Sequence, residues 1–209
     1  MKIAMINASP KAKNSASEFL LDSFGHYLSG HTKVQITLRT HELQKEDINQ
    51  MMQCDIWVIA FPLYVDALPS HLLSCLLELE QQMRQYRKKI ILYALVNSGF
   101  YEAHQNIWAL AVLKNWCKRA GIAWGQGMAV GGGGMLPGVK NVPIGHGPLK
   151  NLGNAMKQMA QQVLQREAGD DILVKPNFPR FLYRRIADWG WTQQIKKNGG
   201  RTRDLGRKL

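Results

Sequence analysis

The chain has 209 residues and a formal net charge of +12 at pH 7, with 45% hydrophobic and 20% charged residues. This length accommodates one α/β domain of ordinary size plus an appendage, and this composition excludes a disordered chain. The longest apolar run, residues 56–65, is too short to span a membrane, and the apolar stretch after Met1 is too short for a signal peptide. We therefore expect a soluble, cytoplasmic protein without a transmembrane segment.

Short apolar runs alternate with longer helical patterns over most of the chain. Five runs fit buried strands because most are apolar at both alternating positions: residues 2–6, 34–38, 56–61, 90–96 and 123–130. Five other segments fit helices: residues 15–28, 46–52, 69–86, 103–120 and 149–166. The alternation predicts an α/β fold, a doubly wound parallel sheet with helices on both faces.

The loop at residues 7–17 connects the first strand to the first helix. In an open parallel sheet, ligands bind beyond the carboxyl ends of the strands, and a helix N-terminus suits a phosphate because it presents free N–H groups and a positive dipole. The side chains that would add donors are Ser9, Asn14, Ser15 and Ser17. The alternative is a simple capping box made by Ser15 and Glu18, which leaves Ser9 unexplained.

Three further loops have unusual compositions. Residues 62–70 hold an apolar segment between prolines, beside which a flat aromatic ligand would lie; the alternative is a rigid connector. Residues 97–102 combine Gly99 with two aromatic residues; the alternative is a turn with incidental aromatics. Residues 131–147 predict a long loop, in which Gly131–Gly134 either admits a nicotinamide ring or is only flexible.

The loops at residues 7–17, 62–70 and 97–102 together resemble those of the NADPH-dependent FMN reductase branch of the flavodoxin-like superfamily. The match lies in N-A-S-P-K-x-K-N-S-x-S, P-L-Y-V-D-x-L-P and N-S-G-F-Y, which occur in the expected order within residues 1–170. The resemblance implies a five-stranded sheet in the order 2-1-3-4-5, bound FMN, NADPH or NADH as electron donor, and a homodimer or homotetramer. Iron–sulfur members of the superfamily carry a cysteine cluster before the third strand, where this chain has only Cys54, so that chemistry is not implied.

The same resemblance assigns residues to three parts of a flavin site. Those that match the FMN-phosphate loop are Ser9, Lys11, Ser15 and Ser17. Those that match the loop beside the isoalloxazine, with backbone N–H groups near its pyrimidine end, are Pro62, Leu63, Tyr64 and Val65. Those that match the third flavin loop are Asn97, Ser98, Gly99 and Phe100.

The function that follows is an oxidoreductase that passes electrons from NAD(P)H through FMN to a small acceptor such as a quinone, flavin, nitro or azo compound. The flavin carries the redox chemistry, so no catalytic side chain is assigned. The alternatives are a flavodoxin-type electron carrier and a flavin-binding sensor or interaction protein. Turnover of NAD(P)H with a simple acceptor separates the first hypothesis from the other two.

Cysteine and histidine spacing predicts no metal site. Cys54, Cys75 and Cys117 lie far apart without a CxxC pair, so we expect reduced, packed cysteines. The histidines show no triad or metal-ligand pattern, and none is given a catalytic role: His26, His31, His41, His71, His104 and His146.

The C-terminal extension, residues 171–209, differs from the body in charge. Ten of the last 35 residues are Lys or Arg and two are Asp, which gives this stretch +8 of the total charge. Its segment 181–191 is interpreted as amphipathic, because tryptophans and aliphatic residues alternate there with arginines. We favour docking of its apolar side on the body or on a partner subunit; the alternatives are a membrane surface or nucleic acid.

Overall fold

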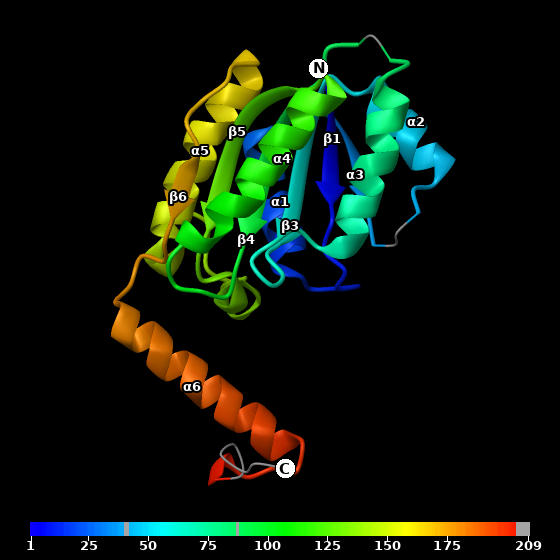
Figure 1. The fold of residues 1–209 in the computed structure, drawn as a ribbon. Helices are drawn as coiled ribbons and strands as arrows, with labels where there is room; N and C mark the ends of the chain where they lie inside the picture. Colours follow the sequence, from blue (N-terminus) through cyan, green and yellow to red (C-terminus); the bar gives the residue numbers. More distant parts are fainter. Residues whose placement is uncertain (40–41, 87, 204–209) are drawn as a thin grey trace. The chain divides into compact units, whose positions relative to one another are not determined.

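The computed structural model describes residues 1–39, 42–86 and 88–203 (Figure 1). His41 and the last six residues of the basic extension lie outside this set. The described part of the chain forms two compact units, one over Met1–Pro176 and a second that begins at Asn177. The first unit thus extends six residues beyond the boundary at residue 170 that the sequence predicts.

A parallel sheet forms the centre of the first unit. Its strands are β1 (Lys2–Asn7), β2 (Thr32–Thr37), β3 (Ile56–Pro62), β4 (Ile91–Asn97), β5 (Ala123–Val130) and β6 (Ile172–Val174). Their order in the sheet is β2-β1-β3-β4-β5-β6, and every neighbouring pair is parallel.

The prediction of five strands is wrong by one, because β6 adds to the edge of the sheet beside β5. Its three residues pair with Met128–Val130, and the Gly131 N–H extends the pairing by donating to the Val174 carbonyl at 2.8 Å. A strand this short, directly before Lys175 and Pro176, has no detectable period in sequence. The relative order of the other five strands is as predicted.

Helices cover both faces of the sheet, as the sequence predicts. The helices of the first unit are α1 (Ala16–Tyr27), α2 (Lys45–Gln53), α3 (Ser70–Met83), α4 (Ile107–Ala120) and α5 (Lys150–Gln165). Helices α1 and α5 pack on one face, and α2, α3 and α4 pack on the other. Among the residues that the structure describes, 3-10 helices occupy three connections: η1 (His104–Asn106), η2 (Gly133–Val139) and η3 (Gly147–Leu149). The predicted loop at residues 131–147 therefore contains local helical structure.

The central strands carry the core of this unit. Strand β3 is buried from Ile56 to Phe61, and Trp57 and Phe61 are among its largest fully buried side chains. Full burial of an apolar side chain of this size contributes about 1.5–3 kcal/mol to folding. The apolar positions on both strand faces, which predicted a covered parallel strand, are thus the two halves of the core.

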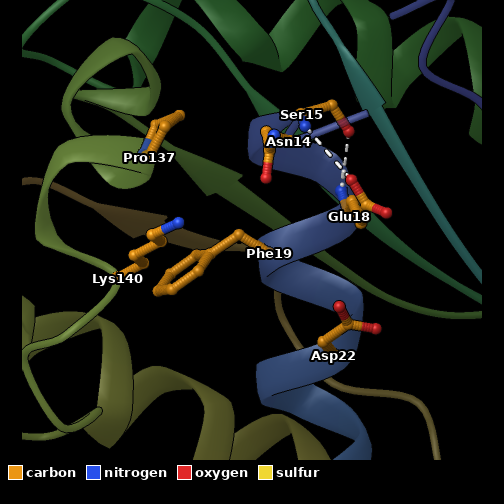
Figure 2. Close-up of a pocket in the computed structure, with 7 residues that line it drawn as sticks. All are labelled: Asn14, Ser15, Glu18, Phe19, Asp22, Pro137 and Lys140. Carbon is orange, nitrogen blue, oxygen red and sulfur yellow. Dashed lines mark hydrogen bonds between the residues drawn. The ribbon is translucent and has the colours of Figure 1, made fainter. Parts of the chain in front are cut away.

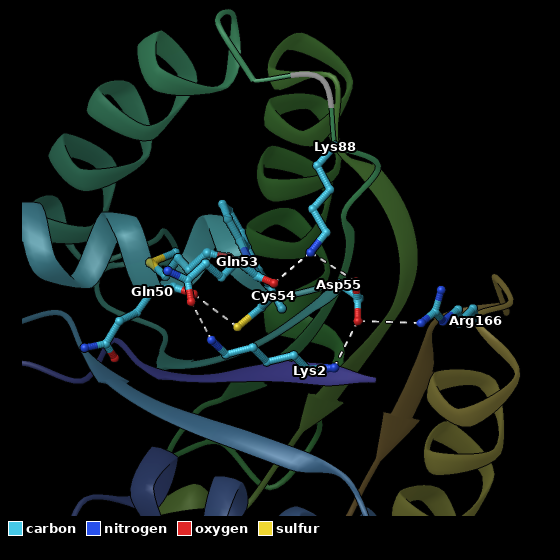
Figure 3. Close-up of polar contacts among 9 residues, drawn as sticks. Lys2, Gln50, Gln53, Cys54, Asp55, Lys88 and Arg166 are labelled. Carbon is cyan, nitrogen blue, oxygen red and sulfur yellow. Dashed lines mark hydrogen bonds and ion pairs between the residues drawn. The ribbon is translucent and has the colours of Figure 1, made fainter.

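Charged groups pair at the amino ends of the strands (Figure 3). Asp55, just before β3, accepts a hydrogen bond from the Lys2 backbone N–H at 2.9 Å and forms ion pairs with Lys88 at 3.1 Å and Arg166 at 3.6 Å. Lys88 also donates to the Gln53 carbonyl at 2.7 Å. The Lys2 N–H and the Lys88 ammonium lower the pKa of Asp55 and outweigh the opposing effect of burial.

The second unit is a helix, α6 (Arg180–Lys197), with its flanking residues. Charged and apolar side chains are interspersed around its whole circumference, so the amphipathic character predicted for residues 181–191 is weak. Trp189 and Trp191, for example, stand about 160° apart around the axis, because each residue advances by about 100°. Within the described residues, no helix is long and apolar enough to cross a membrane.

Candidate functional site

Three loops meet at the carboxyl edge of the sheet, where β1, β3 and β4 end side by side. They are residues 8–15, 63–69 and 98–103, and each leads into a helical segment. The order of the strands places β1 and β4 on either side of β3. The structure therefore brings together the three loops that carry the sequence motifs of the predicted flavin site.

The first loop ends in a complete capping box. The Glu18 N–H donates to the Ser15 hydroxyl at 3.0 Å, and the Ser15 N–H donates to the Glu18 carboxylate at 3.3 Å. The alternative explanation of Ser15 and Glu18 is thus present in the structure. A cap satisfies only some of the free N–H groups in the first turn, so it does not preclude an anion at this helix start.

The remaining residues of this loop are divided between buried and exposed positions. Ser9 is buried and its hydroxyl accepts the Lys11 N–H at 3.3 Å, while Lys11 and Asn14 are exposed. The Lys11 ammonium donates to the Asn14 carbonyl at 3.2 Å, and Asn14 has a positive φ of 54°. Asn14 tolerates this left-handed conformation better than most residues do. The exposed part is therefore a tight turn that carries two cations, Lys11 and Lys13.

Asn97, at the end of β4, links the start of α1, the end of β3 and the first residue of the second loop. Its side-chain amide donates to the Ser17 hydroxyl at 2.9 Å and to the Phe61 carbonyl at 3.1 Å. Its backbone carbonyl accepts the Leu63 N–H at 2.8 Å. Asn97 and Ser17 are both buried, so their polar groups hold the loops in register. The Ser17 hydroxyl acts here as an acceptor and keeps its own proton to donate.

The second loop turns sharply over two residues. Tyr64 and Ala67 exchange two backbone hydrogen bonds of 3.0 Å each, and between them Val65 and Asp66 have φ values of 48° and 56°. Positive φ at both central positions defines a type I′ turn, which Asn and Gly favour and a β-branched residue disfavours. The Val65 side chain is 98% exposed, so no packing of that side chain offsets the strain.

This turn changes which backbone groups are available to a ligand. The resemblance implies N–H donors from residues 63–65, but the Leu63 and Tyr64 N–H groups already donate to Asn97 and Ala67. The Val65 N–H donates to no acceptor among the described residues. Val65 is thus the donor of the three that this conformation leaves for a bound group.

The third loop contains a buried hydroxyl without a partner. The Ser98 backbone is fixed, because its N–H donates to the Val130 carbonyl at 3.0 Å and its carbonyl accepts the Gly133 N–H at 2.7 Å. Its Oγ atom is buried and has no hydrogen-bond partner within the described part of the chain. An unsatisfied buried hydroxyl is costly, and one at a strand-end loop is a group that a ligand would satisfy. Gly99 and Phe100, the next two residues, are exposed.

The glycine-rich segment after β5 packs against this third loop. The N–H groups of Gly132 and Gly133 donate to the carbonyls of Phe100 and Ser98. A side chain at Gly133 would lie 2.9 Å from the Asn97 Oδ1 atom, closer than a Cβ atom normally approaches. The glycines therefore allow the backbone of this segment to pack closely against the backbone of the third loop, on one side of the candidate site.

A pocket of about 330 Å³ opens beside the first loop, between α1 and η2 (Figure 2). Its lining residues are Asn14, Ser15, Glu18, Phe19, Asp22, Pro137 and Lys140. Burial, and secondarily Glu18, raise the pKa of Asp22 against an opposing effect of His26. Lys140 adds a further cation near the predicted phosphate loop, which already carries Lys11 and Lys13. Sequence patterns did not point to it, because it lies in a segment interpreted only as a long loop.

The described residues offer no metal centre and no reactive thiol. No three His, Cys, Asp or Glu side chains cluster among them. All three cysteines are free and buried, as predicted, and burial raises the pKa of Cys75 to about 11 and that of Cys117 to about 12. Thiols with such pKa values stay protonated and unreactive near neutral pH.

Comparison with known proteins shows the class of fold. No protein-family model matches the sequence, and no curated protein matches it significantly. Solved structures do match: a WrbA-like flavodoxin from Agrobacterium tumefaciens superposes with a TM-score of 0.56 at 10% identity, covering 79% of this chain and 97% of its own. A flavodoxin from Streptococcus pneumoniae gives 0.53 at 14%, covering 78% and 99%. An NADH:FMN oxidoreductase gives 0.52 at 15%, covering 77% and 88%.

The first unit therefore has a flavodoxin-like fold. The flavodoxin-like fold that the three loop motifs predicted is thus confirmed. The sixth strand and helix α6 are the elements that the predicted five-stranded sheet does not contain.

Proposed function

We propose that this protein is an FMN-dependent oxidoreductase that takes electrons from NADPH or NADH and passes them to a small acceptor. The acceptor classes are quinones, free flavins, nitro compounds and azo compounds. The observation that carries the proposal is that three strand-end loops converge near Asn97. Two of these loops contain a donor without a partner among the described residues: the Ser98 hydroxyl and the Val65 N–H. These donors fit the polar edge of a flavin ring, which offers oxygen and nitrogen acceptors.

In this proposal the start of α1 holds the FMN phosphate. The helix N-terminus and the Lys11 ammonium supply positive charge, and the Ser9 and Ser17 hydroxyls keep protons to donate. The residues proposed for this part of the site are Ser9, Lys11, Asn14, Ser15 and Ser17. Ser15 contributes mainly by fixing the helix start, because its hydroxyl already accepts the Glu18 N–H.

The second and third loops would hold the isoalloxazine ring. The residues proposed here are Pro62, Leu63, Tyr64, Val65, Asn97, Ser98, Gly99 and Phe100. Tyr64 and Phe100 are half-exposed aromatic residues on these two loops, able to contact a flat ring. Asn97 acts as a positioning residue, since its amide and carbonyl are already engaged within the chain. Bound FMN would supply the electron-transfer chemistry, and the loops would bind and orient it.

The neighbouring structures support both a reductase and a carrier. One is named an NADH:FMN oxidoreductase, and two are named flavodoxins. A flavodoxin-type electron carrier, or a flavin-binding sensor, is therefore the second candidate. We favour the reductase because the three loop motifs resemble that branch and because flavodoxins that act as carriers are usually acidic, whereas this chain is basic. A homodimer or homotetramer is part of the same proposal.

The first test is flavin binding by the full-length protein. We expect purified protein to show the absorbance of bound flavin, and apoprotein to quench the fluorescence of added FMN. Ser98→Ala should weaken FMN binding about 5–10-fold, as loss of one hydrogen bond predicts. Ser23→Ala, at a buried serine in the middle of α1, is the matched control and should bind like the wild type. A colourless protein that does not bind added FMN would refute the proposal.

The second test separates the reductase from the carrier. The holoprotein is mixed with NADPH or NADH and a simple quinone, and nicotinamide oxidation is followed under steady-state conditions. Sustained turnover with either donor supports the reductase. A flavin that is bound but not reduced by either nicotinamide would favour the carrier or the sensor.

A further inference from the structure

Helix α6, drawn in orange in Figure 1, carries large apolar side chains on its surface. None of its 18 residues, all of them within the described part of the chain, is buried. The most exposed of its large apolar side chains are Phe181, Leu182, Ile186, Trp189 and Trp191. Their exposed fractions range from 39% to 67%. Apolar side chains gathered in this way mark a surface that binds something.

Three of these side chains form one stripe along the helix. Leu182, Ile186 and Trp189 follow one another by four and three residues, which is the spacing of a single helix face. At about 100° per residue they span about 60° of the circumference. No charged residue of α6 falls within this arc, although charged and apolar side chains mix around the rest of the helix. These three residues are called the α6 stripe.

Basic side chains border the α6 stripe. By the same helical geometry, Arg185 and Lys196 lie on one side of it and Lys197 lies on the other. Asp188 is the only acidic residue of this helix and lies outside the stripe. Long basic side chains keep their alkyl stems on apolar groups while their charged ends reach outward. A stripe with this border fits a partner that is apolar inside and negatively charged at its surface.

Both units of the chain are basic. Residues 177–209 contain nine Lys or Arg and two Asp, which is a net charge of +7, and residues 1–176 carry the remaining +5. The sequence favours docking of this extension on the body or on a partner subunit, but that docking would bring two positively charged units together. An anionic surface attracts both units instead.

We propose that α6 binds the surface of a lipid bilayer that contains anionic lipids. The α6 stripe would enter the boundary between headgroups and acyl chains, with the helix lying in the plane of the surface. The cations that border the stripe would pair with lipid phosphates: Arg185, Lys196 and Lys197. Trp189 suits this boundary, because tryptophan combines an apolar ring with a polar N–H and is enriched where membranes meet water.

Nucleic acid is the competing anionic partner, and the α6 stripe does not suit it. A helix that binds nucleic acid presents cations and hydrogen-bonding groups to phosphates and base edges. Leu182 and Ile186 offer neither a hydrogen bond nor a flat ring on which a base stacks. Aliphatic side chains at the centre of the stripe match the acyl chains of a lipid surface.

This inference goes beyond the proposed redox function and does not rest on it. Binding of α6 to lipid is expected with or without flavin in the first unit. Failure of FMN binding and failure of lipid binding are therefore separate outcomes. Together with the proposed reductase activity, lipid binding would bring the enzyme close to acceptors that dissolve in a bilayer, such as quinones with apolar tails.

The test is flotation of the full-length protein with lipid vesicles. Vesicles that mix phosphatidylcholine with phosphatidylglycerol are compared with vesicles of phosphatidylcholine alone. We expect the wild type to bind the anionic vesicles at least about 10-fold more tightly and to lose this preference in high salt. Exchanging Arg185, Lys196 and Lys197 together for glutamine should remove most of the preference.

Two tryptophans of equal exposure test the α6 stripe itself. Trp189 is 66% exposed and lies in the stripe, whereas Trp191 is 67% exposed and lies about 160° away around the helix. Trp189→Ala should weaken binding to anionic vesicles about 10-fold, and the matched control Trp191→Ala should weaken it at most about 3-fold. Circular dichroism verifies that each variant is folded.

Four results would overturn the proposal. The first is a wild type that does not bind anionic vesicles, and the second is an equal loss of binding in Trp189→Ala and Trp191→Ala. The third is tighter binding to a DNA or RNA oligonucleotide than to vesicles, weakened by Trp189→Ala, which would assign α6 to nucleic acid. The fourth is a lower free energy of unfolding for Trp189→Ala in the absence of lipid, which would show that the stripe docks on the protein itself.

Discussion

At the amino ends of the strands the chain pairs charged side chains with one another, whereas at the carboxyl ends it buries uncharged hydroxyl and amide groups. At the amino ends, Asp55 accepts a hydrogen bond from one backbone N–H and pairs with two cations (Figure 3). At the opposite end, the Asn97 side-chain amide donates both to the Ser17 hydroxyl at the start of α1 and to the Phe61 carbonyl at the end of β3. Both ends belong to the same parallel sheet, so sheet geometry alone does not explain the difference.

The two ends differ in whether their polar groups find all their hydrogen-bond and ion-pair partners within the chain. The Asp55 cluster satisfies its charge within the chain and has nothing left to offer a ligand. The carboxyl end contains the buried Ser98 hydroxyl without a partner among the described residues and a two-residue turn with positive φ. Unsatisfied groups and backbone strain concentrate where a protein binds something. We therefore expect substitutions at the amino end to change stability alone, and those at the carboxyl end to change stability and flavin binding together.

The largest effect is expected at Asn97. Asn97→Ala removes both side-chain hydrogen bonds and leaves the Ser17 hydroxyl and the Phe61 carbonyl buried without this donor. The free energy of unfolding should fall by about 2–3 kcal/mol, measured by urea denaturation, because two buried groups lose their partner. FMN affinity should fall as well, since the three loops lose their common anchor.

Asn106→Ala is the matched control for that prediction. Asn106 is also fully buried, but its amide donates once, to the Val130 carbonyl at 3.2 Å. Its loss should cost about 1 kcal/mol, in proportion to one hydrogen bond. Equal losses for the two variants would show that Asn97 is an ordinary buried amide rather than the anchor of the loops.

A smaller loss is expected at the amino end, from Asp55→Asn. At neutral pH the substitution should lower the free energy of unfolding by about 1 kcal/mol, because a partly exposed carboxylate loses its charge-assisted contacts. The pKa of Asp55 is lowered in the folded state, so its contribution is complete above its ordinary pKa and is lost as the pH falls through the folded value. The difference between wild type and variant should therefore shrink in acid, while FMN affinity stays unchanged.

Asp22→Asn supplies the opposite sign. Burial raises the pKa of Asp22, so its charged form opposes folding above that pKa, and the asparagine variant should be slightly more stable than wild type at neutral pH. Stability curves from pH 3 to 8 for both variants would test the comparison. Parallel curves would contradict the assignment of distinct environments to the two carboxylates.

The sequence predicts most of the fold because long apolar runs carry it. Strand β3 is apolar at every position from Ile56 to Phe61. This pattern is typical of a parallel strand that is covered on both faces. Strand β6 has three residues, too few to show any period, and its partner is chosen by pairing with residues about forty positions earlier. Short edge elements depend on tertiary contacts, so sequence patterns did not predict this one.

The location of the candidate site is also readable in sequence, but the division of labour among its residues is not. Strand ends mark the three loops, since topology brings the carboxyl ends of parallel strands together. The hydrogen bond between Asn97 and Ser17 joins positions 80 residues apart, and no local pattern indicates it. The positive φ of Val65 contradicts the intrinsic preference of valine, so propensity predicts the opposite conformation.

The smallest expected effect is an increase in stability at this turn. Val65→Gly removes a strained left-handed valine, worth about 1–2 kcal/mol, and adds the conformational entropy of glycine to the unfolded chain, which offsets up to about 1 kcal/mol. The net gain in unfolding free energy should be about 0.5–1 kcal/mol by urea denaturation. Ala67→Gly, in the same turn but without positive φ, should instead lose stability. Because Val65→Gly keeps the N–H donor, FMN affinity should fall only if the exposed valine side chain itself contacts the flavin. A fall in affinity would then show that the strained valine is kept because its side chain contributes to binding.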